Sequence, residues 1–347
     1  MSYRIARKFA CVVVALFGFV LSGGASAESA AEFYKGKTIT VLSPFGASGG
    51  YGRTVILLAE YFPRHLPGKP NGVPQFMPGV GGIKMANYLY NVAPKNGTVI
   101  ALLYDNIPTA QMLYPKRGVK YDSRRFNALG SLRTGDRGLV GIRPDAPVNT
   151  LDAIKSRELM MGASGTGSSQ YIVPVVLNKT IGTKFKVVTG YKSIGKIFLA
   201  IEQKEVFGTV GSLSIFSQLR PDWVNKGGVK WLAQIGLSRH KKLPNVPLLQ
   251  DLTNNKAHKE VLVFLSRGRA MAKGMVAPPG IPPERAKALR AAFDALVKDP
   301  DFLKAAAKGR VWIEPKPWTY LQKVINATVE VDPKVLALTK SLISSKK

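Results

Sequence analysis

Short apolar runs alternate with glycine-rich turns and amphipathic segments along the first third of the chain. Residues 37–42 predict a buried strand, the loop 43–50 follows, and residues 53–62 carry apolar side chains at helical spacing before Pro63. The same alternation gives an extended piece, a helix and a strand at 75–77, 83–92 and 98–103. Because strand, glycine-rich turn and helix recur in this order, the pattern predicts a parallel, doubly wound α/β sheet.

The pattern restarts near residue 127 and predicts a second set of strands and helices. Strands are expected at 139–142, 159–163, 185–189, 206–210 and 229–235, and helices from Thr150, at 171–178 and at 194–204. From Met275 onward the pattern is helical, with helices expected at 285–298, after Asp299 and at 318–331. We therefore predict two α/β lobes: residues 28–130 plus 274–347 form the first, and residues 131–273 form the second.

The first 27 residues have the layout of a cleavable secretory signal peptide. A basic start with Arg4, Arg7 and Lys8 precedes an apolar run of 13 residues, 9–21, and Ala25-Ser26-Ala27 offers a small-x-small cleavage site. A membrane anchor is the alternative, but the run is too short to span a hydrocarbon core of about 30 Å. We expect an exported protein of the periplasm that begins at Glu28.

Charge is the unusual feature of the composition. The chain of 347 residues has 50 Lys+Arg and 21 Asp+Glu, so its net charge is 50 − 21 = +29, and 46% of its residues are hydrophobic. This apolar share excludes a disordered polycation. One Cys and three His exclude metal-rich and disulfide-rich classes. The basic residues are dispersed, and the densest clusters, 239–242 and 267–269, are assigned to solvated surface.

Three glycine-rich loops, 46–52, 79–82 and 164–169, lie after expected strands and before expected helices. A helix N-terminus has unpaired N–H groups and the positive end of the helix dipole, and glycine lets a ligand approach the backbone closely. One such loop is ordinary turn chemistry. Three of them, spread over both lobes, favour a carboxylate or phosphate held between the lobes.

Motifs that would indicate nucleotide binding or hydrolysis are incomplete in this sequence. Residues 190–196 (GYKSIGK) have phosphate-loop spacing, but Ile197 stands where Ser or Thr must bind Mg²⁺. Residues 79–84 lack the third glycine of a dinucleotide fingerprint, and residues 162–166 lack the last glycine of a hydrolase elbow. His65, His240 and His258 lie near no such Ser in the sequence and are assigned to the surface. We expect no catalytic residue, no metal and no cofactor.

The chain resembles the Bug family of periplasmic solute receptors, the binding components of tripartite tricarboxylate transporters. The resemblance covers most of the mature chain and is carried by residues 34–41, 44–51, 65–70, 77–82, 86–98, 162–169, 190–192 and 276–285. It implies a two-lobe periplasmic binding protein fold of type II, each lobe a mixed or parallel sheet flanked by helices, which closes on a carboxylate in the cleft. It also implies that loops 45–51 and 79–82 hold the carboxylate while loop 164–169 closes from the other lobe.

The chain departs from the family pattern at three places. Gly52 takes the position of an Asp, Val55-Ile56 takes that of an Ala-Arg pair, and Tyr171 stands where the family often has His. Losing an acid and a base from one loop changes its hydrogen bonding, which affects the class of ligand. Gly52 also makes the loop more flexible.

Our hypothesis is a receptor that binds a small organic acid, such as a di- or tricarboxylate or an aromatic acid, and delivers it to membrane transporter subunits. We expect a monomer that binds no nucleic acid. The expected ligand-binding residues are Phe45, Ser48, Gly49, Gly50, Tyr51, Gly81, Gly82, Asn106, Ser164, Thr166, Ser168, Ser169, Tyr191 and Ser212. A receptor that presents its ligand to a membrane sensor, an exported polyanion-binding protein and an exported hydrolase are the alternatives.

Overall fold

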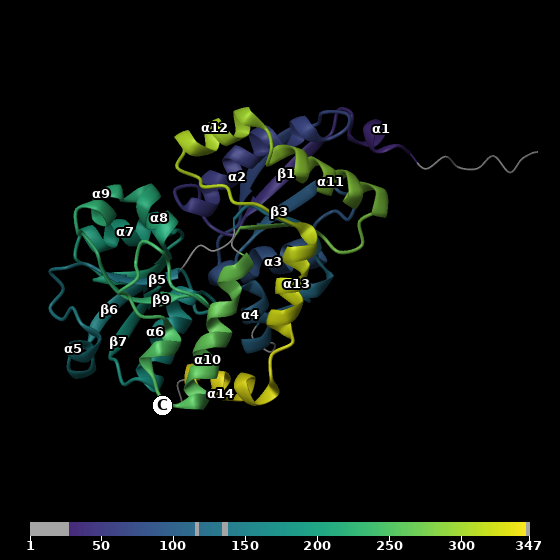
Figure 1. Ribbon diagram of the computed structural model, residues 1–347. Coiled ribbons are helices and arrows are strands. Elements are labelled where there is room, and N and C mark those ends of the chain that lie inside the picture. The colour runs from purple at the N-terminus through teal and green to yellow at the C-terminus, as the bar shows by residue number, and fades with distance from the viewer. Residues whose placement is uncertain (1–27, 115–117, 134–137, 272, 345–347) are drawn as a thin grey trace, which may run out of the picture.

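The computed structural model describes residues 28–114, 118–133, 138–271 and 273–344, which form two sheets with helices on both sides of each (Figure 1). The predicted signal peptide lies outside the described residues. None of the described helices is both long and apolar enough to cross a membrane.

The first sheet has six strands in the order β11-β4-β10-β3-β1-β2. Their bounds are β1 Thr38–Ser43, β2 Asn71–Phe76, β3 Val99–Leu103, β4 Asn127–Ser131, β10 Gly274–Ala277 and β11 Lys316–Pro317. Strands β1, β2 and β3 are parallel, as predicted, but β10 runs antiparallel to both β3 and β4. The sheet is therefore mixed, which agrees with the expected mixed or parallel sheet flanked by helices, because β10 joins this sheet only after the chain has returned from the second one.

The second sheet has five strands in the order β7-β6-β8-β5-β9. Their bounds are β5 Gly138–Ile142, β6 Leu159–Ala163, β7 Phe185–Thr189, β8 Gly208–Ser212 and β9 Lys230–Ile235. Strands β6, β7 and β8 are parallel, whereas β5 is antiparallel to β8 and β9. This sheet is mixed as well.

Each sheet is covered on both faces because alternate residues of its strands point to opposite sides. Ile39 and Val41 of β1 face one cluster of the first lobe, while Leu42 faces another. The first cluster includes residues of α1 Ala30–Tyr34, α2 Gly50–Tyr61, α11 Pro283–Leu296 and α12 Pro300–Lys308. The second includes residues of α3 Ile83–Asn91, α4 Ile107–Leu113 and α13 Trp318–Val329, and continues into the second lobe.

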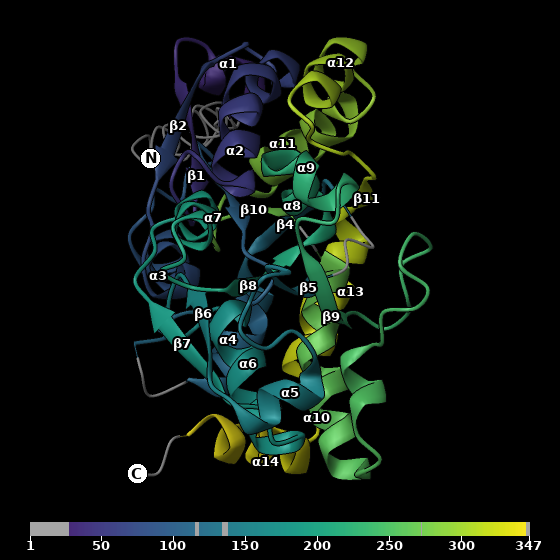
Figure 2. The same ribbon diagram turned by 90° about the vertical axis from the view of Figure 1, so that its left-hand side faces the viewer.

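The second sheet is covered in the same way. Its outer cluster contains residues of α7 Ile194–Glu202 and α8 Leu213–Leu219, with α9 Pro221–Asn225 packed beside them. Its other face contacts α5 Leu151–Ser156 and α6 Ser169–Thr180. Figure 2 shows α7, α8 and α9 on one side of this sheet and α5 and α6 on the other.

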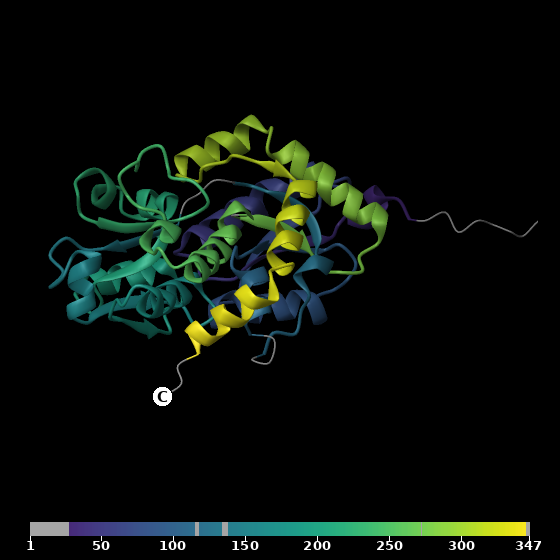
Figure 3. The ribbon, with the colours of Figure 1, turned by 60° about the horizontal axis from the view of Figure 1, so that its bottom comes forward.

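Two helices that the sequence pattern did not predict join the lobes. Helix α10 (Lys256–Arg267) packs against α6 and α13, and the C-terminal α14 (Pro333–Ile343) packs against α10, α6 and α4. Figure 3 shows α13 leading into α14, which runs toward the second lobe. The hydrophobic cluster that these helices share therefore extends without interruption across both lobes.

His65 is not a simple surface residue, as the sequence analysis had assigned it. Its side chain is only 21% exposed, and its Nε2 lies 2.9 Å from Oδ2 of Asp299. Asp299 also caps α12 by accepting hydrogen bonds from the N–H groups of Asp301 and Phe302. This contact connects the short helical segment Phe62–His65, which follows α2, to the N-terminus of α12.

Candidate functional site

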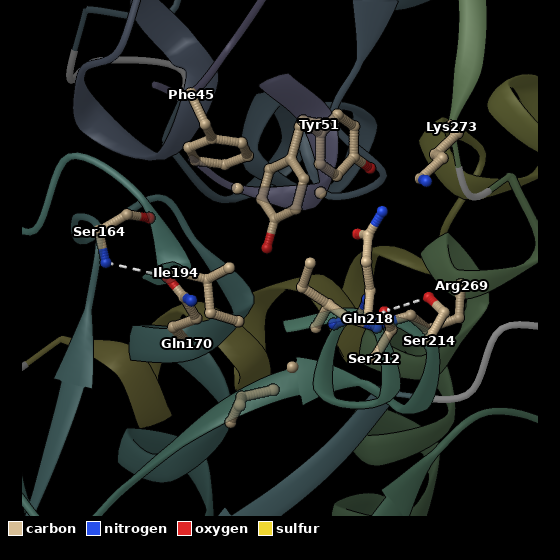
Figure 4. Close-up of a pocket in the computed structure, with 16 residues that line it drawn as sticks. Phe45, Tyr51, Ser164, Gln170, Ile194, Ser212, Ser214, Gln218, Arg269 and Lys273 are labelled. Carbon is tan, nitrogen blue, oxygen red and sulfur yellow. Dashed lines mark hydrogen bonds between the residues drawn. The ribbon is translucent and has the colours of Figure 1, made fainter. Parts of the chain in front are cut away.

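A cavity with a volume of about 80 Å³ lies between the two lobes (Figure 4). This is several times the roughly 10–15 Å³ that one ordered water requires. Both lobes and the connection between α10 and β10 contribute to its wall. The lining residues are Phe45, Gly49, Gly50, Tyr51, Tyr104, Ser164, Gln170, Ile194, Val210, Gly211, Ser212, Ser214, Ile215, Gln218, Arg269 and Lys273.

The N-terminus of α2 forms one wall of the cavity. Its N-cap residue, Gly49, provides no side-chain hydrogen bond, so the first N–H groups of the helix are not capped from the side chain. Gly50 fits here because a Cβ atom would lie 2.5 Å from Cδ1 of Ile215 in the opposite lobe. Glycine thus lets the second lobe approach the positive end of this helix dipole.

Gly52, which stands where the family pattern has Asp, is required by the packing of the preceding loop. A Cβ atom at this position would lie 2.4 Å from the carbonyl oxygen of Gly46 and 2.6 Å from Cα of Ala47. The preceding loop folds against the first turn of α2, and only glycine leaves room for it. An aspartate at position 52 is incompatible with this loop conformation.

Ser164 supplies a polar group from the second lobe. It directly follows β6, and its backbone N–H donates to Oε1 of Gln170 at 2.9 Å. Its Oγ atom is buried and has no hydrogen-bond partner. Figure 4 shows this side chain on the cavity wall below the ring of Phe45. A buried hydroxyl without a partner is costly, so a ligand that accepts or donates here would be stabilised.

Three aromatic rings of the first lobe form a mutually edge-to-face cluster. Phe45 lies with its ring centroid 5.5 Å from that of Tyr51 and 4.9 Å from that of Tyr104, and the two tyrosine rings are 5.7 Å apart. Burial raises the pKa of Tyr104 to about 12, and it raises the pKa of Tyr51 well above its ordinary value. Both phenols are therefore protonated at neutral pH, and the Tyr104 hydroxyl is 2.8 Å from Oγ of Ser169.

Two basic side chains reach the cavity from the segment between α10 and β10. Arg269 forms a buried ion pair with Asp105 at 2.8 Å and donates to Oγ of Ser169 at 3.1 Å. Arg269 is only 9% exposed, so its assignment to solvated surface was wrong. The assignment of residues 267–269 rested on their charge alone, because the acidic partner of Arg269 lies 164 residues away in the sequence.

Lys273 is also buried, and its Nζ donates to Oγ1 of Thr54 at 2.9 Å. That hydroxyl donates in turn to the carbonyl oxygen of Gly50 at 2.6 Å. Lys273 has a φ of 57°, which is the left-handed region that non-glycine residues rarely adopt. Strained backbone of this kind persists where surrounding contacts fix it, and it clusters at functional sites.

The loops of the two lobes contact one another directly. Across the gap, Oγ of Ser48 lies 2.8 Å from Oγ of Ser193, and the side-chain amide of Asn106 donates to the carbonyl oxygen of Gly167. Gly81 has a φ of 63° and lies against the other lobe, because a Cβ atom here would be 2.6 Å from the backbone nitrogen of Ser168. The described conformation is therefore closed.

The structure brings only part of the predicted site together. Of the predicted residues, Phe45, Gly49, Gly50, Tyr51, Ser164 and Ser212 line the cavity. A neighbouring hollow, which shares Phe45 and Ser164 with it, is lined by Gly81 and Tyr191. Ser48, Asn106 and Ser169 make interlobe hydrogen bonds instead. Gly82 packs near Pro44, Ser168 bonds to Gly165 within its own loop, and Thr166 is exposed.

Several lining residues were not predicted from the sequence. These are Tyr104, Gln170, Ile194, Val210, Gly211, Ser214, Ile215, Gln218, Arg269 and Lys273. Two signals were available: Tyr104 directly follows β3, and Ser214 stands at the start of α8, after β8. Ligand sites form at such strand ends in open α/β sheets. Nothing in the local sequence marks the other residues.

The sequence matches the model of one protein family over most of its length. Residues 73–331 match the tripartite tricarboxylate transporter family receptor. The chain belongs to this receptor family. The predicted resemblance is thereby confirmed, and so is the two-lobe α/β fold. Receptors of this family are periplasmic solute-binding proteins and not enzymes.

Solved structures support the fold of the receptor. It is similar to the periplasmic binding protein BugD, with 21% identity, a TM-score of 0.67, and coverage of 89% of this chain and 98% of that one. It is also similar to MatC from Rhodopseudomonas palustris with bound malate, with 18% identity, a TM-score of 0.66, and coverage of 89% of this chain and 99% of that one. A second R. palustris protein, solved with adipate, has 19% identity and a TM-score of 0.66, and the match covers 88% of this chain and 97% of that one. No curated protein matches the chain significantly.

Proposed function

We propose that this receptor binds a small organic acid in the cavity between its lobes. The observation that carries the proposal is the pairing, in one cavity between the lobes, of the unpartnered buried hydroxyl of Ser164 with the N-terminus of α2, whose N-cap residue makes no side-chain hydrogen bond. A carboxylate accepts hydrogen bonds from both groups and is favoured by the helix dipole. The relatives solved with malate and adipate fit this ligand chemistry.

A thermal-shift screen of mono-, di- and tricarboxylates against their uncharged amides tests the proposal. At a concentration 100-fold above the dissociation constant, a bound acid should add about 2.7 kcal/mol to the free energy of unfolding. We expect stabilisation by at least one acid and none by its amide. Stabilisation by amides, sugars or amines without any response to acids would contradict the proposal.

We also propose that the receptor acts in the periplasm and passes its ligand to the membrane subunits of a tripartite tricarboxylate-type transporter. The layout of residues 1–27 and the family membership support this role. Mass spectrometry of the exported protein should find an N-terminus at Glu28. Deleting the cognate membrane subunits should abolish uptake of the acid but leave its binding to the purified receptor unchanged.

A further inference from the structure

We infer that the receptor selects acids that have one carboxylate and a compact apolar body over di- and tricarboxylates. This inference rests on the proposed function, since it assigns a class of acid to the same cavity. It is carried by two observations: the composition of the walls, and the partners that their polar side chains already have.

The walls that face each other across the cavity are apolar. From the first lobe come the rings of Phe45, Tyr51 and Tyr104, and from the second come Ile194, Val210 and Ile215. Ile194 lies at the junction, since Cβ atoms added to Gly49 and Gly211 would be 3.8 and 3.0 Å from its side chain. Apolar walls of this kind favour ligands that bury carbon, and they give no compensation to a charged group that loses its water.

Most polar side chains of the cavity are bonded to other parts of the protein. Oγ of Ser212 lies 2.9 Å from Oγ of Ser214 and accepts from the N–H of Ile215. The amide of Gln218 donates to the carbonyl oxygen of Gly309 at 2.9 Å. These groups hold α8 and its lobe in place. A second carboxylate would have to compete with these contacts.

The two cations are engaged in the same way. Arg269 is paired with Asp105, whose side chain is only 4% exposed, so drawing the guanidinium toward a ligand would leave a buried carboxylate uncompensated. Lys273 is held by Thr54, which in turn bonds to the first turn of α2. Among the lining residues that the structure describes, Ser164 has the buried side-chain oxygen without a partner. Together with α2 it can serve one carboxylate.

Titration calorimetry with the full mature chain tests the inference, using benzoate, cyclohexanecarboxylate, malate, adipate, citrate and benzamide as probes. We expect benzoate or cyclohexanecarboxylate to bind at least about tenfold more tightly than malate, adipate and citrate, the discrimination that an apolar pocket ordinarily reaches. Tighter or equal binding of any di- or tricarboxylate would overturn the inference and leave the proposed function standing. Binding of benzamide as tightly as benzoate, or of no acid at all, would overturn both.

A pair of matched variants tests the apolar wall itself. Ile194→Thr replaces part of that wall with a hydroxyl, while Ile56→Thr makes the same change at a side chain of α2 that is 44% exposed. We expect Ile194→Thr to weaken benzoate binding by about tenfold and to change malate binding by less than about twofold, with Ile56→Thr changing neither. An equal loss for both acids, or no loss for benzoate, would contradict selection by this wall. Thermal unfolding of the two variants separates loss of binding from loss of folding.

Discussion

Ser164 is the single side chain whose removal best tests how the acid is held. Its buried Oγ has no partner within the protein, so a Ser164→Ala receptor loses no internal hydrogen bond. A hydrogen bond to a charged group contributes about 1.5–3 kcal/mol, so we expect acids to bind roughly 10- to 150-fold more weakly. Calorimetry measures the loss, and Ser156→Ala, at the exposed end of α5, is the control. Unchanged affinity in Ser164→Ala would place the carboxylate elsewhere.

Gly81 tests closure of the lobes. Alanine here is strained twice: by the positive φ of 63° and by the short distance to Ser168 of the opposite lobe. Gly182, with a φ of 79° and no atom within 4 Å of an added Cβ, carries the backbone strain alone. We expect both Gly→Ala variants to lose about 1–2 kcal/mol of stability, but only Gly81→Ala to bind acids at least about tenfold more weakly. Equal affinities in the two variants would show that this contact does not govern closure.

Sequence reasoning found those cavity residues whose role is local. Gly49 and Ser164 stand between a strand and a helix, and Gly50 begins α2, so their neighbours in the chain already indicate a binding site. Arg269 and Lys273 could not be found in this way. Their partners, Asp105 and Thr54, lie 164 and 219 residues away, and only the tertiary fold brings them together.

At the scale of elements, most strands were predicted, but β4, β10 and β11 were not. Strand β3 is buried along its whole length, and the corresponding apolar run was predicted as a strand at 98–103. Strand β10 is equally buried, but it has only 4 residues and is followed by Pro278, so its pattern was assigned to the helical end of the chain. Helix α14 begins at Pro333 and has few buried residues, so its pattern was too weak to predict it.

The cap of α12 gives a prediction that depends on pH. Burial by itself would raise the pKa of Asp299, but hydrogen bonds from the N–H of Asp301 and from His65 outweigh it, and the pKa is lowered. The stabilisation by Asp299 is therefore complete above its unfolded pKa of about 3.9 and is lost as the pH falls through its lower folded pKa. Asp299→Ala should cost about 1 kcal/mol at pH 7 and progressively less below pH 4.

Denaturant unfolding across this pH range measures the effect of Asp299→Ala. Asp294→Ala, which removes an exposed carboxylate of α11, is the matched control and should change stability little at any pH. A deficit of Asp299→Ala that stays constant from pH 7 to pH 2 would show that the carboxylate charge is not what stabilises the helix.

The large positive charge is a property of the whole molecule. Cleavage after residue 27, as proposed, would remove only Arg4, Arg7 and Lys8 and would leave a net charge of 29 − 3 = +26. The cavity is lined by residues of both lobes, and its Arg269–Asp105 ion pair is buried, where added salt screens little. Dispersed surface charge acts instead on the rate at which anions arrive.

Salt dependence distinguishes an acid receptor from a polyanion-binding protein. Between 50 and 200 mM salt we expect the affinity for the acid to fall by less than about tenfold, with the change mainly in the association rate. A protein that binds a polyanion through several surface cations loses about 10³–10⁵ in affinity over the same interval. Stopped-flow binding, with heparin as the comparison ligand, separates the two. A steep loss for the acid would favour the polyanion alternative.

Helix α14 is the last described element, and it contacts α4 of one lobe and α6 of the other. All strands of both sheets precede it in the chain. Each sheet can therefore be complete before this helix, which contacts both lobes, is available. The strands of both lobes are therefore synthesised first, and one set of contacts between the lobes can form only after α14 has been made. A premature stop codon before Pro333 would leave two finished lobes without that connection.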